Sequence, residues 1–112
     1  GEGFLRFFEE RCVRQGFFVF DEPEAALSPL RQIALLKILR RMQQIGKCQA
    51  IIATHSPILM ACPGAGLLEI TRGGLSPTRL EDTQHFRLMR ELCTNPSSFI
   101  DLMMDDDGSD AA

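Results

Sequence analysis

The stretch Phe17-Phe18-Val19-Phe20-Asp21-Glu22-Pro23 decides the fold of this chain. Four apolar residues, aromatic or β-branched, precede two carboxylates and a proline. An unbroken apolar run of this kind predicts a strand that is buried on both faces. Because burying an unpaired carboxylate costs free energy, we expect the strand to end at Phe20, with Asp21 and Glu22 at its carboxyl end. In open α/β sheets, this is the edge at which ligands bind.

A helix is predicted after this strand. Ser28 is a favourable N-cap, Pro29 suits the first helical position, and Gly46 is the expected C-cap. The basic residues of this helix are explained by a solvated face, so a nucleic-acid partner is not indicated. The apolar face that we expect to pack on the sheet comprises Leu35, Ile38, Leu39, Met42 and Ile45.

A second buried strand is predicted over residues 50–53, directly before Thr54 and His55. Two strands joined through one helix form a βαβ unit, in which the strands are parallel. Parallel strands end at the same edge of the sheet, and neighbouring strands lie about 5 Å apart. We therefore expect His55 to lie beside Asp21 and Glu22, where one ligand could contact both strand ends.

The remaining segments predict further, simpler elements. Residues 2–15 indicate an amphipathic helix that ends at Gly16. Residues 67–71 and 75–80 indicate a β-hairpin, and residues 81–93 indicate a helix with Phe86, Met89, Leu92 and Cys93 directed inward. Asn95-Pro96 then begins a short final helix. Residues 105–112 are acidic enough to predict a disordered tail.

These motifs, in this order, resemble those of ABC-type ATPases. The pattern is similar to the AAA-type, ABC-like ATPases of bacteria, in which DEPEAALSP and ATHSP recur. The matching segments are the tail of the signature motif (Gly1-Glu2-Gly3), Walker B (17–23), the D-loop (24–29) and the switch-histidine loop (53–57). The resemblance implies a three-layer, P-loop NTPase-like α/β fold with a parallel sheet, present here in part, followed by a C-terminal β-hairpin and a helical tail.

The resemblance also implies roles for individual residues in binding ATP and Mg²⁺. Asp21 would be the magnesium partner, Glu22 would orient and polarise the attacking water, and His55 would reach the γ-phosphate. The other expected nucleotide-binding residues are those of the signature tail and the dimer seam, namely Gly1, Glu2, Leu27 and Ser28.

The Walker A loop, G-x-x-x-x-G-K-S/T, does not occur in this sequence. Gly46-Lys47 is followed by Cys48 and follows a helix, whereas a Walker A loop begins one. We therefore interpret residues 1–104 as the C-terminal part of an ABC-like ATPase domain. The expected partners are ATP, the N-terminal half of the same domain with its Walker A loop, and a second copy bound on ATP binding.

Composition limits the alternatives. The chain has 112 residues, a net charge of −3 and 45% apolar residues, which predict one small folded domain. No signal peptide or membrane-spanning run is evident, so we expect a cytoplasmic protein. Two other functions stay open: a truncated, non-catalytic remnant that acts as an interaction module, and the ATPase part of a nuclease-linked defence or repair protein.

Overall fold

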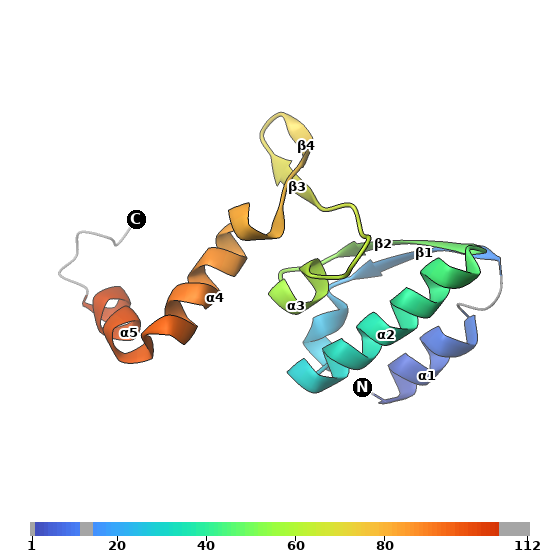
Figure 1. The fold of residues 1–112 in the computed structure, drawn as a ribbon, viewed down its shortest axis with the longest axis horizontal. Helices are drawn as coiled ribbons and strands as arrows, with labels where there is room; N and C mark the ends of the chain where they lie inside the picture. Colours follow the sequence, from blue (N-terminus) through green and yellow to red (C-terminus); the bar gives the residue numbers. More distant parts are fainter. Residues whose placement is uncertain (1, 12–14, 106–112) are drawn as a thin grey trace. The chain divides into compact units, whose positions relative to one another are not determined.

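The computed structural model describes residues 2–11 and 15–105 (Figure 1). It divides into two compact units, residues 1–67 and 68–112, which are described separately below. Within the described residues, no helix combines the length and the apolar character that crossing a membrane requires. The structure is α/β, as predicted, with a small parallel sheet in the first unit and a β-hairpin followed by helices in the second.

Two parallel strands form the sheet of the first unit. They are β1 (Gly16–Asp21) and β2 (Cys48–Ala53), paired in register from Gly16 with Cys48 to Asp21 with Ala53. The predicted βαβ unit is therefore confirmed. The expectation that the strand ends at Phe20 is wrong by one residue, because Asp21 can extend the backbone ladder while its side chain stays exposed.

Helix α2 (Pro29–Ile45) connects the two strands, and its caps follow the prediction. The Ser28 hydroxyl accepts a hydrogen bond from the backbone N–H of Arg31 at 3.3 Å. Gly46 has φ 75°, a conformation that favours glycine, and its N–H donates to the Met42 carbonyl at 2.9 Å. Of the predicted apolar face, Ile45 is 39% exposed, so its expected burial is wrong, and the buried members are Leu35, Ile38, Leu39 and Met42.

The core of the first unit lies on one face of the sheet. Helix α1 (Glu2–Arg11) and α2 lie on the same side of β1 and β2 (Figure 1). The strand residues on this side pack against the buried cluster, which comprises Leu5, Leu27, Leu35, Ile38, Leu39, Met42 and Leu59. The other face is open: Phe17, Val19 and Ile51 are 59%, 67% and 55% exposed. The prediction of strands buried on both faces is therefore wrong for the described residues, which supply helices to one face only.

The described residues contain the helix predicted over residues 2–15 in part. The described part of α1 ends at Arg11, and residues 12–14 lie outside the described part of the chain. Gly16 was expected to end this helix, but it is the first residue of β1. It also does not share the positive φ of Gly46, Gly64 and Gly74, which a left-handed C-cap would need.

The second unit begins with the predicted hairpin. Strands β3 (Leu68–Thr71) and β4 (Gly74–Pro77) are antiparallel, and a 3₁₀ turn, η2 (Leu80–Asp82), precedes α4 (Gln84–Thr94) and α5 (Pro96–Met104). Helix α4 starts at Gln84 rather than at Glu81. The expected inward direction of Met89 and Cys93 is wrong, since both are exposed and no residue of α4 or α5 is buried.

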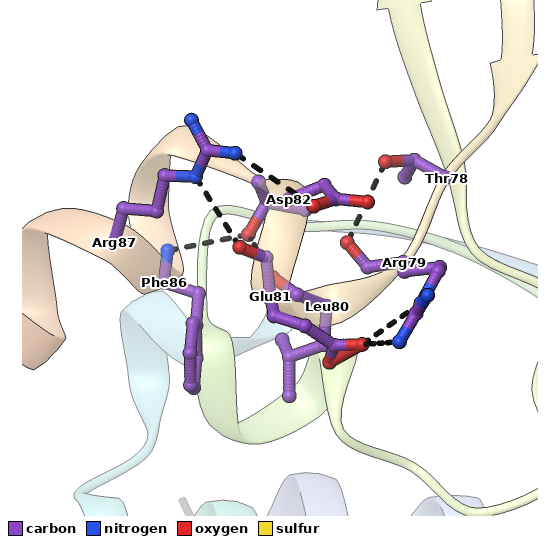
Figure 2. A network of polar contacts seen from close by, with 8 residues as sticks. Thr78, Arg79, Leu80, Glu81, Asp82, Phe86 and Arg87 are labelled. Carbon is purple, nitrogen blue, oxygen red and sulfur yellow. Dashed lines mark hydrogen bonds and ion pairs between the residues drawn. The ribbon is translucent and has the colours of Figure 1, made fainter.

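A polar network fixes the start of α4 (Figure 2). The Thr83 hydroxyl caps the helix by accepting from the Phe86 N–H at 3.2 Å. Arg87 donates to the Glu81 carbonyl at 3.3 Å and lies 3.7 Å from the Asp82 carboxylate. These contacts explain why the helix begins after the turn. Of the acidic tail predicted to be disordered, residues 106–112 lie outside the described residues.

Candidate functional site

Two loops leave the same edge of the parallel sheet. We call residues 22–28, which follow β1, the β1 loop, and residues 54–56, which follow β2, the β2 loop. The β1 loop contains a 3₁₀ turn, η1 (Pro23–Ala26), and the β2 loop leads into α3 (Pro57–Met60). Because β1 and β2 are parallel and their last register pair is Asp21 with Ala53, the two loops begin side by side.

Glu22 has an unusual backbone conformation. Its φ of 49° and ψ of 56° are left-handed, and it is the only non-glycine residue with positive φ among those described. This conformation costs a non-glycine residue about 1–2 kcal/mol. Its N–H donates to the Ala53 carbonyl at 2.7 Å, which holds the residue against the end of β2. Backbone strain of this kind is concentrated at functional sites.

The structure brings Glu22 and His55 together, as the sequence predicted. Glu22 Oε1 lies 4.0 Å from His55 Nε2, and the two side chains are 54% and 65% exposed. This distance is too long for a hydrogen bond, and an exposed pair contributes little to stability. The pair therefore contributes little to holding the fold together.

Asp21 is exposed at the end of β1, next to this pair in the chain. No group of three or more histidine, cysteine, aspartate or glutamate side chains among the described residues could hold a metal ion. Magnesium, however, is commonly bound through one or two carboxylates together with substrate phosphates. A single exposed aspartate fits such a shared site but does not form one by itself.

Glu24 is a site residue that the sequence analysis missed. Its Oε1 accepts a hydrogen bond from Thr54 Oγ1 at 2.6 Å, and its Oε2 accepts one from the His55 N–H at 2.9 Å. Burial raises the pKa of Glu24, but these hydrogen bonds, together with interactions with its own backbone and with the His55 side chain, outweigh burial and lower the pKa below its ordinary value of 4.5. The available signal was the position of Glu24, a third carboxylate just after the strand.

A second link between the loops is buried. Gln32, on the first turns of α2, donates from Nε2 to the Leu27 carbonyl at 3.2 Å, and its Oε1 accepts from the Ser56 hydroxyl. Ser56 Oγ also caps α3 by accepting from the Leu59 N–H at 3.2 Å. Gln32 precedes Leu35 by three residues, so its helical spacing could have shown that it faces the core.

The remaining predicted site residues are not brought to the Glu22–His55 pair by any described contact. Leu27 belongs to the core, with its side chain buried, and Ser28 is exposed as the N-cap of α2. Glu2 begins α1, and its side chain is not described. Gly1 lies outside the described residues.

Comparison with known families identifies the class of this chain. Residues 4–61, just over half of the chain, match the family model described as "AAA domain, putative AbiEii toxin, Type IV TA system". The chain belongs to this family, and the matched segment is that of a AAA-type, P-loop ATPase-like domain. The matched segment includes β1, β2, α2, the β1 loop and the β2 loop. Comparisons with curated proteins and with solved structures found no match.

Proposed function

We propose that this chain is part of a larger ATPase of the ABC-like type, which binds ATP and hydrolyses it with Mg²⁺ as a nucleotide-bound dimer. One observation carries the proposal: Glu22 Oε1 and His55 Nε2, in the loops that follow two neighbouring strands, lie 4.0 Å apart. They lie at the carboxyl-end edge of the parallel sheet of a AAA-family domain, the edge at which open α/β sheets bind ligands. The family match supports ATPase-like chemistry, and the geometry supports these residues as its site.

The roles of the residues follow from what hydrolysis requires. An attacking water must be oriented and must lose a proton, and Glu22 offers an exposed carboxylate for both tasks. His55 is placed to meet the γ-phosphate from the neighbouring loop. Asp21 would hold Mg²⁺, the ion that neutralises charge on the phosphates during the reaction.

The remaining nucleotide contacts belong to the proposed dimer. Gly1 and Glu2 would end the signature loop, whose helix N-terminus suits a phosphate group. Leu27 and Ser28 would lie at the dimer seam. Because the Leu27 side chain is buried in the core and its carbonyl accepts from Gln32, the exposed Ser28 would make the contact at this position. The phosphate cradle would come from the N-terminal half of the domain with its Walker A loop.

The test compares two proteins. The longest natural chain that contains this sequence should carry a Walker A loop upstream and should hydrolyse ATP when Mg²⁺ is present. The 112-residue chain, which has no such loop, should show neither hydrolysis above background nor submillimolar ATP binding by calorimetry. Saturable ATP binding by the 112-residue chain at tens of micromolar, or a natural chain without ATPase activity, would contradict the proposal.

A further inference from the structure

We propose that Glu24 is a positioning residue of this site: its carboxylate joins the β1 loop to the β2 loop and holds His55 beside Glu22. The bridge itself is a matter of geometry, whereas its consequence for catalysis rests on the proposed ATPase function. Glu24 would act through His55 and would not contact the nucleotide.

The two hydrogen bonds of Glu24 use different oxygens and different kinds of donor. Oε1 accepts from the Thr54 side chain at 2.6 Å, and Oε2 accepts from the His55 backbone at 2.9 Å. A carboxylate held at both oxygens cannot rotate freely. The backbone of His55 is therefore tied directly to the turn that follows Glu22, and the direction in which the imidazole leaves the loop is set by that tie.

A carboxylate suits this position better than an amide. Both Thr54 and His55 present donors, and an ionised glutamate accepts at both oxygens, whereas glutamine has one accepting oxygen and one donating nitrogen. Hydrogen bonds to a charged acceptor are also shorter and stronger than neutral ones. The lowered pKa of Glu24 agrees with this arrangement, because these bonds favour the ionised form.

Thr54 connects Glu24 to the next part of the β2 loop, at Ser56. Its hydroxyl donates to Glu24 and accepts from the Ser56 N–H at 2.9 Å, so its orientation is fixed from both sides. Ser56 is held separately by the buried Gln32. The β2 loop therefore has a second anchor, and we expect variants of Glu24 to fold while the backbone of His55 becomes more mobile.

The first test is amide hydrogen exchange of the chain, followed by NMR. Glu24→Ala removes both acceptors and Glu24→Gln retains one, so protection of the His55 amide should fall roughly tenfold in Glu24→Ala and by less in Glu24→Gln. Glu9→Gln is a matched control, because Glu9 is an exposed carboxylate of the same unit that pairs with Arg41. Glu9→Gln should leave the exchange protection of the His55 amide unchanged. Unchanged protection of His55 in both Glu24 variants would overturn the proposal.

The second test uses the ATPase that contains this chain. Glu24→Gln should lower kcat at least several-fold while KM for ATP stays within about twofold, since an interaction lost only in the transition state acts in this way. In a His55→Ala background, Glu24→Gln should cause no further loss, because its effect passes through His55. An unchanged kcat, or losses that multiply in the double variant, would overturn the proposal. A wild-type protein without ATPase activity would contradict the proposed function. The exchange experiment would still show whether Glu24 holds the backbone of His55.

Discussion

The backbone N–H of Glu22 donates to the carbonyl oxygen of Ala53 at 2.7 Å, which continues the parallel ladder one residue beyond the last register pair. This bond fixes the left-handed backbone of Glu22 against the start of the β2 loop. The position of Glu22 relative to the end of β2 is consequently set by the sheet itself. A one-residue shift of register would change the spacing between the β1 loop and the β2 loop, and it would also turn the side chains of the shifted strand to the other face of the sheet.

Glu22→Gln should separate ATP hydrolysis from ATP binding in the intact ATPase. The amide keeps the shape but cannot accept a proton, and positioning or general-base groups contribute ~10²–10⁴-fold to rate. We expect hydrolysis to fall by about that factor while ATP binding survives and the ATP-bound dimer lives longer. Single-turnover hydrolysis, together with size-exclusion chromatography in ATP and Mg²⁺, measures both effects.

Asp21→Asn is the matched comparison, because it makes the same chemical change at the neighbouring residue. If Asp21 holds Mg²⁺, this variant should weaken magnesium-dependent ATP binding itself. A Glu22→Gln protein that hydrolyses ATP at the wild-type rate would exclude Glu22 as the catalytic group. Equal effects of both variants on binding would contradict the separate roles.

Gln32→Leu should destabilise the first unit from inside the core. The change leaves the Leu27 carbonyl without its side-chain donor and the Ser56 hydroxyl without its acceptor. Leaving buried polar groups unsatisfied costs about 1–3 kcal/mol in the free energy of unfolding. Urea unfolding measures this change. Gln44→Leu is the control, since Gln44 lies on the same helix but is exposed, and its loss should stay within about 0.5 kcal/mol.

A double-mutant cycle identifies the cause of the Gln32 effect. Ser56→Ala removes the hydroxyl that Gln32 accepts from, so the combined variant should cost less than the two single changes added together. Strictly additive losses would show that the two side chains do not interact. A Gln32→Leu protein as stable as the wild type would show that this buried link does not support the fold.

The sequence predicts the βαβ frame because the decisive signals there are local. The apolar runs of the strands, the Ser28 cap and the glycine at position 46 each act within a few residues, and all agree with the structure. The parallel order of the strands then places Asp21, Glu22 and His55 at one edge without knowledge of any side-chain contact.

The roles of Glu24 and Gln32 in linking the two loops could not be predicted in this way, because their hydrogen-bond partners lie far away in the sequence. Thr54 and Ser56 are 30 and 24 residues away, respectively. Periodicity shows which face a residue occupies, but it does not show which donor it meets. Similarly, the apolar pattern of β1 indicates that both faces favour burial, but not which segment covers each face.

The Glu24 bridge should weaken in acid. The pKa of Glu24 is lowered in the folded protein, so its contribution to stability is fully present above about pH 4.5, the ordinary glutamate value, and is lost as pH falls through the lower folded value. The difference in free energy of unfolding between the wild type and Glu24→Gln isolates this group from other carboxylates. It should be constant above pH 5 and should shrink below about pH 4.5. A difference that grows in acid would contradict this assignment.

The exposed face of the sheet should make the 112-residue chain associate with itself. Phe17, Val19 and Ile51 form an apolar surface on strands that also present unpaired edges within the described two-stranded sheet. Such surfaces and edges are prone to association. We expect binding of a dye that reports exposed apolar surface, and a sedimentation or light-scattering mass that rises with concentration.

Val19→Thr combined with Ile51→Thr tests whether this face is responsible. Threonine keeps the β-branched shape that strands favour while adding a hydroxyl. The two side chains are already exposed, so stability should change little, whereas dye binding and association should decrease together. Ile52→Thr is the matched control, because Ile52 belongs to the same strand but packs against the core. It should lower the unfolding free energy by about 1–3 kcal/mol without reducing association. A wild-type chain that stays monomeric, melts in one sharp transition and binds no dye would show that this face does not drive association.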